Sequence, residues 1–356
     1  MQKPVLCLTI LIALIFTACS HTKEMTGDYL TDIETDVKYS VIYYIHADSD
    51  YLYHDSDGEP VRENSDVLKT AIDVAESAHS GEVFIYYQQR ERKILWLFPR
   101  RSSRLYHYRN GRLINQIKYR HPDKKEAFLA TESQLLNQYR AQNRSDDHQN
   151  YFLYFGHEIP SENGVGYHRS LPDMKVNTVS FAKGIQNLLL TDEDRFDLVV
   201  LSTCNNGTPE MAKLLIPFTD AMLASPQNLH LSHLDSDKLT HLEMEPDISP
   251  IQLGHLMAEK SFQRLAETVQ TTITLALYHF EDVEPYINTL ASLIAENKVS
   301  DRSVQFQDNV DCAQFNLFEP GAYRQGVETW YKPARFGRQS GQSAHSGWGC
   351  KPGLDD

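Results

Sequence analysis

Two short, largely apolar segments that each end in a reactive side chain constrain the fold more than any other feature of the sequence. Residues 151–155 are followed by Gly156 and His157, and residues 196–201 are followed by Ser202, Thr203 and Cys204. The segment 178–190 between them has the spacing of an amphipathic helix. Strand, helix and strand in this order predict a right-handed crossover between parallel strands. Their reactive ends should then meet at the edge where open α/β sheets bind ligands.

Further strands and helices are expected around this unit. β-Branched and aromatic residues at 39–45 predict a buried strand, and apolar residues at helical spacing over 67–75 predict a helix. The remaining expected elements are strands at 82–88, 93–98 and 103–119 with a hairpin turn at Asn110-Gly111, helices at 126–140, 209–217, 250–277 and 283–296, and a polar loop at 145–150.

The N-terminus has the pattern of an export signal. Lys3 precedes a twelve-residue apolar run at 5–16, which is too short to span a bilayer comfortably as a mature anchor. The run ends in the tetrapeptide FTAC, whose last residue is Cys19, and this resembles the lipobox of bacterial lipoproteins with Phe in place of the usual Leu. The resemblance implies lipidation of Cys19 and an anchor in the bacterial cell envelope, and Ser20 beside it favours the outer membrane. An ordinary secretory signal is the alternative.

The cysteine count leaves one thiol to explain. The chain has five cysteines, Cys7, Cys19, Cys204, Cys312 and Cys350. Cys7 would leave with the signal and Cys19 would carry lipid, so three remain in an oxidising compartment. Cys312 and Cys350 could pair near the C-terminus, which leaves Cys204 as the odd thiol.

The balance of charge argues against a nucleic-acid partner. The chain has 34 Lys and Arg against 48 Asp and Glu, a formal net charge of −14. Binding to phosphate backbones needs clustered positive charge. A nucleic-acid partner is therefore not expected, whereas the lipid on Cys19 implies contact with a membrane.

The chemistry at the strand ends is that of a nucleophilic thiol. An ordinary thiol is mostly protonated at neutral pH and needs a nearby base or cation to act as a nucleophile. His157 precedes Cys204 by 204 − 157 = 47 residues, close to the caspase-type spacing of about 50. The alternative is that Cys204 only fills space in a core and that His157 only makes a hydrogen bond.

At these residues the sequence resembles the clostripain family of cysteine peptidases, relatives of caspases and gingipains. The matching segments are 43–48 (YYIHAD), 154–157 (YFGH), 196–207 (FDLVVLSTCNNG) and 209–225. The resemblance implies a caspase-like α/β fold, a mostly parallel sheet flanked by helices with a helical C-terminal region. It also implies that Cys204 is the nucleophile, that His157 is the general acid/base, and that the backbone amides of Glu158 and Cys204 form an oxyanion hole.

Two residues depart from the family pattern. Glu158 stands where the family has Gly, and Ser202 stands where the family tends to carry an Asp that selects Arg or Lys at the cleavage point. Asp48 or Asp50 on the neighbouring loop could restore an acidic pocket, and we expect Asp48, Ser202 and Ser225 to line the substrate site. Self-cleavage occurs in relatives, and the Arg-rich segment 140–144 is one candidate loop.

The expected organisation is a signal peptide at 1–18, a tether at 19–37, a caspase-like catalytic domain at 38–250, a helical C-terminal part of the same domain at 251–334 and an irregular tail at 335–356. No cofactor is expected. The acidic loop at 48–59 could hold calcium but lacks EF-hand spacing, and capping or solvated roles are favoured over a metal site for His230, His233 and His241. His157 and Glu158 do not continue as a zinc-binding H-E-x-x-H motif.

The sequence therefore predicts an envelope-anchored cysteine endopeptidase. The competing hypotheses are a catalytically inactive caspase-like lipoprotein that binds a peptide or partner at the same edge, which Glu158 and Ser202 favour, and another amide-hydrolysing enzyme with the same Cys-His pair.

Overall fold

The computed structural model describes residues 36–350, apart from 48–51, 55–59, 90–91, 95–97, 101–102, 122–125, 162–164, 169–170, 192, 230–232, 297–308 and 315–321. The chain divides into two units, Met1–Thr35 and Asp36–Asp356. The expected signal peptide and Cys19 belong to the first unit and lie outside the described residues. None of the helices in the described part is long and apolar enough to cross a membrane.

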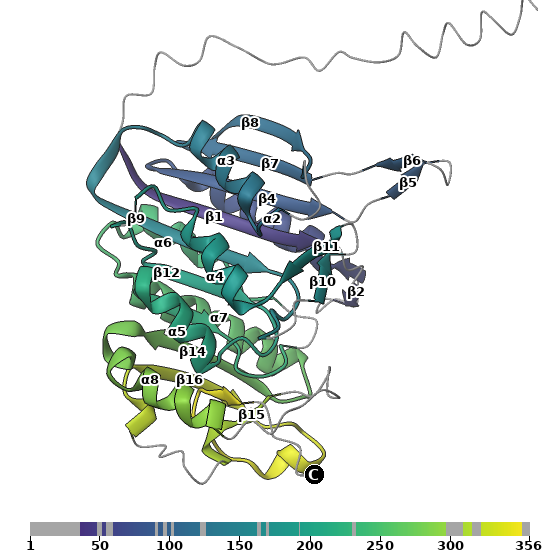
Figure 1. The fold of residues 1–356 in the computed structure, drawn as a ribbon, viewed down its shortest axis with the longest axis vertical. Helices are drawn as coiled ribbons and strands as arrows, with labels where there is room; N and C mark the ends of the chain where they lie inside the picture. Colours follow the sequence, from purple (N-terminus) through teal and green to yellow (C-terminus); the bar gives the residue numbers. More distant parts are fainter. Residues whose placement is uncertain are drawn as a thin grey trace, which may run out of the picture. The chain divides into compact units, whose positions relative to one another are not determined.

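A nine-stranded sheet in the order β16-β14-β13-β12-β9-β1-β4-β7-β8 forms the centre of the second unit (Figure 1). Its strands are β1 (Val37–Ala47), β4 (Gly81–Gln89), β7 (Ser103–Arg109), β8 (Arg112–Tyr119), β9 (Arg144–Phe155), β12 (Leu198–Ser202), β13 (Ala221–Ala224), β14 (Ile273–His279) and β16 (Val327–Lys332). The five strands from β4 to β13 in this order are parallel, and the outer strands run antiparallel to their neighbours. The predicted α/β, mostly parallel, caspase-like sheet is confirmed.

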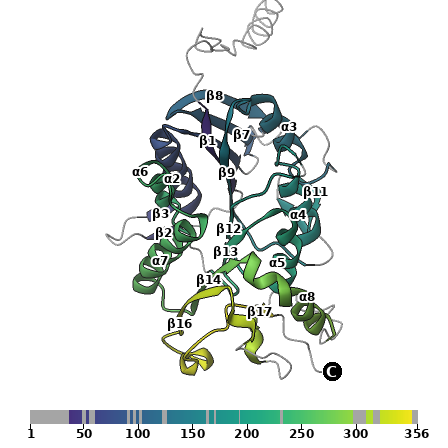
Figure 2. The same ribbon diagram turned by 90° about the vertical axis from the view of Figure 1, so that its left-hand side faces the viewer.

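Helices cover both faces of this sheet (Figure 2). One face carries α2 (Glu63–Ser77), α6 (His241–Met244) and α7 (Pro250–Thr268), and the other carries α3 (Ala130–Tyr139), α4 (Thr178–Gln186), α5 (Pro209–Leu215) and α8 (Phe280–Glu296). Each face has its own hydrophobic core. We call them the α2–α7 face and the α4–α5 face.

The apolar sequence of β1 follows from its place between these two cores. Val41 and Tyr43 pack into the core of the α2–α7 face, whereas Ile42 and Tyr44 pack into that of the α4–α5 face. A strand buried on both faces has no solvated side for polar residues, so residues 41–45 at its centre are a continuous apolar run.

The predicted hairpin turn connects β7 to β8. Asn110 and Gly111 have φ angles of 50° and 70°, the two successive positive values that a type I′ turn requires. Because glycine lacks a Cβ, it adopts this backbone without strain.

Three of the predicted elements are wrong. In place of one strand at 93–98 there are two short antiparallel strands, β5 (Arg92–Ile94) and β6 (Phe98–Arg100). Residues 145–150 form the first half of β9, where Gln149 pairs with Tyr39 of β1. The side chains of this half are exposed or half-buried, so the strand is polar there and has the composition of a loop. The helix expected at 250–277 ends at Thr268, and the residues of β14 follow it.

The region after residue 250 is less helical and less irregular than predicted. It contributes β14 and β16 to the central sheet, and in the Gly- and Ser-rich tail Gly349–Cys350 form strand β17, which pairs with β15 (Val310–Asp311). Trp348 of the tail is fully buried. Composition predicted an irregular tail, but Trp348 and Cys350 pack into the core of the α4–α5 face, whereas Phe336 is exposed.

A half-buried carboxylate ties the start of β12 to β9. The Asn150 amide donates to Asp197 Oδ2 at 2.6 Å, and burial raises the pKa of the Asp197 carboxyl to about 6. This folded-state pKa lies above the unfolded value of about 3.9, so between these pH values the native state binds more protons than the unfolded state. The free energy of unfolding therefore falls as the pH rises through this interval, and it does not recover above it.

We expect Asp197→Asn to raise the free energy of unfolding at pH 8 by about 1–2 kcal/mol, allowing for partial solvent screening, and to leave it unchanged near pH 4. The amide oxygen can still accept from Asn150. Urea unfolding at the two pH values measures the effect, with the exposed Asp146→Asn as the control. Equal shifts at both pH values would contradict the assignment.

Candidate active site

The pairing of β9 with β12 places the ends of these two strands in register. Tyr151 pairs with Leu198 and Phe155 pairs with Ser202, a constant offset of 47 residues. His157 and Cys204 are separated by the same 47 residues, so each stands two positions beyond the last pair. The Gly156 amide continues the contact by donating to the Ser202 carbonyl at 3.4 Å. His157 and Cys204 thus follow neighbouring parallel strands, which lie about 4.8 Å apart, at the same edge of the sheet.

Strand alternation gives the side of the sheet on which Cys204 lies. Leu153 and Phe155 of β9 pack into the core of the α2–α7 face, as does Val200 of β12. Side chains two residues apart on a strand point to the same side, and Cys204 packs against this same core. Extending the alternation of β9 beyond its end predicts the same side for His157.

The Cys204 sulfur is half-buried and lies beside two groups from the loop after β13. The thiol donates to Asn228 Oδ1 at 2.9 Å, and the sulfur accepts the Leu229 N–H at 3.4 Å. Among the cysteines of the described residues, Cys204 is the one that forms no disulfide. The Leu229 N–H would stabilise a thiolate, whereas the Asn228 oxygen accepts from the protonated thiol. Sequence reasoning missed Asn228, because only the pairing of β12 with β13 brings it next to Cys204.

Two asparagines that directly follow Cys204 join its loop to the loop of His157. Asn206 Oδ1 accepts the Ile159 N–H at 3.0 Å, and Asn206 Nδ2 donates to the Ile159 carbonyl at 2.9 Å. Asn205 Nδ2 donates to Glu158 Oε2 at 2.8 Å. The positions of the two loops are therefore coupled by polar contacts from side chains that sequence reasoning noted only as part of a motif.

The residues that directly follow the two predicted oxyanion donors are held by hydrogen bonds. The Ile159 N–H is bound by Asn206, and the Asn205 N–H donates to the Gln227 carbonyl at 2.9 Å. These bonds hold the chain immediately after the amides of Glu158 and Cys204. The oxyanion role of those two amides stays a prediction. The helix that follows, α5, begins at Pro209 with Thr208 as its N-cap.

The predicted substrate-binding residues have different surroundings. Ser202 is buried, and its Oγ accepts the Leu234 N–H at 2.8 Å. Ser225 is fully buried and donates to the Gln227 carbonyl at 2.7 Å. Both hydroxyls thus hold loops around Cys204, and direct contact with a substrate would require those loops to move. Asp48 lies outside the described residues, as do the other acidic residues of its loop.

A second histidine comes from the end of β1. The ring of His46 lies 5.8 Å from that of His157, edge to face, and its Nδ1 is 3.3 Å from Tyr154 Oη. His46 is buried. The ring of His46 therefore packs against the ring of His157 from the end of β1.

The remaining candidate residues lie away from this edge or make ordinary ion pairs. His233 pairs with Asp66 at 3.3 Å and His241 pairs with Glu245 at 3.1 Å, while His230 lies outside the described residues. In the described part, no group of three or more His, Cys, Asp and Glu residues could hold a metal ion. The Arg-rich segment is fixed at the opposite edge, where the Ala141 amide donates to the buried Glu82 carboxylate at 3.0 Å.

We expect Asn206→Ala to lower the free energy of unfolding by about 1–3 kcal/mol, because it leaves the buried N–H and carbonyl of Ile159 without their partners. Denaturant unfolding measures the change. The exposed Asn143→Ala is the matched control and should change stability by less than about 0.5 kcal/mol. Equal effects of the two substitutions would show that Asn206 does not join the loops.

Comparison with known proteins supports the fold. A scan against models of protein families and a search of curated proteins both find no match. Among solved structures, an inactive zymogen of a C11 protease from Parabacteroides distasonis is similar, with 14% identity and a TM-score of 0.55 over 89% of this chain and 92% of that chain. A secreted C11 cysteine protease from Bacteroides thetaiotaomicron in complex with an irreversible peptide inhibitor matches with 13% identity and a TM-score of 0.49, over 74% and 71% of the two chains. The chain therefore has the caspase-like fold of the C11, or clostripain-family, cysteine proteases.

Proposed function

We propose that this chain is a clostripain-like cysteine endopeptidase in which Cys204 is the nucleophile and His157 the general acid/base. The observation that carries the proposal is the register of β9 and β12, whose offset of 47 residues equals the separation of the two side chains. The similarity of the fold to a C11 protease supports the same reading.

The surroundings of Cys204 suit this chemistry. The sulfur accepts the Leu229 N–H, which favours the thiolate that attacks a peptide carbonyl. The imidazole of His157 would take the thiol proton and later donate a proton to the leaving amine. Attack forms the bond from sulfur to the carbonyl carbon, loss of the amine breaks the peptide bond, and water then hydrolyses the acyl-enzyme. The amides of Glu158 and Cys204 would bind the developing oxyanion.

The two departures from the family pattern are compatible with activity. The Glu158 carboxylate accepts a hydrogen bond from Asn205, so its side chain is engaged in joining the loops. The Ser202 hydroxyl is engaged with Leu234. Neither residue supplies the acidic group that selects Arg or Lys in relatives, and we assign that role to Asp48.

We expect Cys204→Ala to abolish cleavage of a peptide library and labelling by a thiol-directed peptide warhead. His157→Ala should lower kcat/KM by about 10²- to 10⁴-fold, because it removes the general acid/base. His255→Ala, on an exposed part of α7, is the control and should retain activity. Labelling of the Cys204→Ala protein would refute the assignment, and peptide binding without cleavage by the unmodified protein would favour the inactive binding module.

We further propose that a lipid on Cys19 anchors the protein in the bacterial envelope, at the outer membrane. The support is the FTAC tetrapeptide at the end of the apolar run. Two or three acyl chains on one cysteine would anchor a protein durably.

Expressed in a bacterium with labelled fatty acid, the chain should incorporate label and partition into detergent, and Cys19→Ala should abolish both. Cys7→Ala is the matched control, because this cysteine leaves with the signal peptide and its loss should change neither. Incorporation of label by the Cys19→Ala protein would contradict the proposal.

A further inference from the structure

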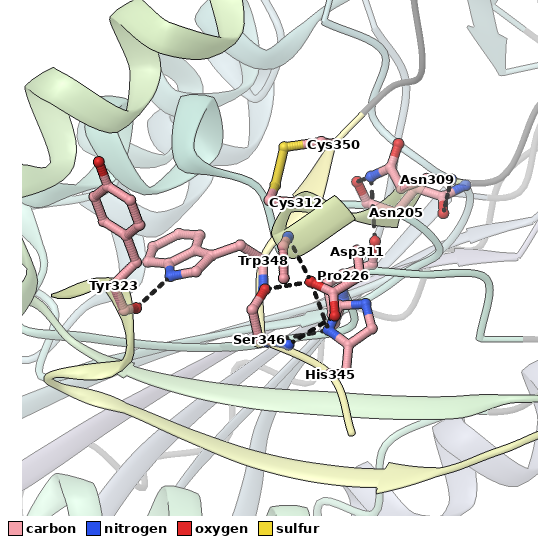
Figure 3. The surroundings of a disulfide bond; sticks show 12 residues. Asn205, Pro226, Asn309, Asp311, Cys312, Tyr323, His345, Ser346, Trp348 and Cys350 are labelled. Carbon is pink, nitrogen blue, oxygen red and sulfur yellow. Dashed lines mark hydrogen bonds and ion pairs between the residues drawn. A yellow bond between two sulfur atoms is a disulfide. The ribbon is translucent and has the colours of Figure 1, made fainter. Parts of the chain in front are cut away.

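The C-terminal segment forms a compact unit beside the Cys204 loop (Figure 3). Strands β15 and β17 pair, and a disulfide joins Cys312 to Cys350 directly beside them. The buried Asp311 carboxylate accepts the amides of Ala313 and Ser346, each at 3.0 Å. We call the two strands with Asn309 and Cys312 the C-terminal clasp.

Asn309, at the start of the clasp, binds the residue that follows the proposed nucleophile. Its Nδ2 donates to the Asn205 carbonyl at 3.0 Å, and its backbone N–H donates to Asn205 Oδ1 at 3.3 Å. The same Nδ2 is 3.2 Å from the Pro226 carbonyl. Pro226 lies two residues before Asn228, whose side chain contacts the Cys204 sulfur. One buried side chain thus connects the two loops that surround the sulfur.

Asn205 needs such support because of its backbone. It has a φ of 58°, in the left-handed region that costs a non-glycine residue free energy and persists only where its surroundings hold it. Each of its polar groups is bound: its N–H by Gln227, its Nδ2 by Glu158, and its carbonyl and Oδ1 by Asn309. Two of these four contacts come from the clasp.

Strand β17 of the clasp also binds the loop that follows Cys204, at Gly207. The Gly349 N–H donates to the Gly207 carbonyl at 2.9 Å. A Cβ at Gly349 would lie 2.1 Å from the Pro226 carbonyl oxygen, so only glycine permits this close approach. The disulfide links Cys350, beside Gly349, to Cys312, three residues after Asn309. It therefore keeps the two points of contact together.

We propose that Asn309 is a positioning residue for Cys204 and that the disulfide-linked clasp holds it in place. The proposal rests on the proposed peptidase function. Asn309 fixes the left-handed turn at Asn205 and the distance between the loops of Cys204 and Asn228, and thereby directs the sulfur toward the substrate carbonyl. Displacement of a reacting group by about 1 Å lowers turnover by about 100-fold.

The test compares the full chain with its Asn309→Asp variant, which keeps the size of the side chain and removes the two Nδ2 donations. We expect kcat to fall by about 10- to 100-fold with KM within about twofold, because the hydrogen bonds of Asn309 go to Asn205 and Pro226 and not to Ser202 or Ser225. Asn115→Asp on β8, the same change on a side chain that contacts only His107 in the described structure, is the matched control and should leave both constants unchanged. Near-UV circular dichroism and thermal unfolding show whether each variant is folded.

A second variant removes the disulfide and keeps Asn309. The double variant Cys312→Ala, Cys350→Ala should lower kcat, as Asn309→Asp does. It provides the test if the Asn309→Asp variant does not fold. The rate of Cys204 alkylation by iodoacetamide is measured for every protein, since it does not depend on peptide cleavage. Absence of peptide cleavage by the unmodified chain would refute the proposed function, whereas an altered alkylation rate in either variant would still support positioning. Unchanged kcat and unchanged alkylation in both folded variants would overturn the proposal.

Discussion

The parallel pairing of β9 with β12 is the constraint on which the candidate site depends. It fixes an offset of 47 residues along the chain, and this offset brings residues from two separate loops to the same edge. A slip of one residue would turn the side chains of one strand to the opposite face and would change which residues follow the two strand ends. Burial of Leu153 and Val200 in the core of one face opposes such a slip, and the hydrophobic core thereby sets the geometry of the polar edge.

Beyond the ends of the strands, hydrogen bonds from asparagine side chains replace those between strand backbones. Asn206 binds both backbone groups of Ile159, and Asn309 binds Asn205. An amide carries donors and an acceptor at fixed positions, so it can replace a paired strand where the chain turns away. The loops around Cys204 therefore combine an irregular course with side-chain hydrogen bonds that join them, which suits a site that must be both accessible and rigid.

The sequence predicted those parts of the fold that depend on local patterns. Buried strands such as β1 and β12 are apolar on both faces, and the hairpin at Asn110 and Gly111 has its turn chemistry in two adjacent residues. His157 and Cys204 were found because each directly follows an apolar run. The polar half of β9 was missed because strand pairing, rather than side-chain burial, holds it in place, and β14 was missed because its uniform apolar composition is equally typical of a buried helix.

The contacts of Asn228 and Asn309 could not be read from local sequence, since each depends on segments that meet only in the folded chain. Asn309 lies 104 residues from Asn205. The central claim, that His157 and Cys204 act together, is tested most directly by a crystal structure of the protein with a peptide warhead bound to Cys204. The account predicts the imidazole of His157 within hydrogen-bond reach of the sulfur or of the leaving-group position. An imidazole turned away from both, or attachment of the warhead elsewhere, would contradict it.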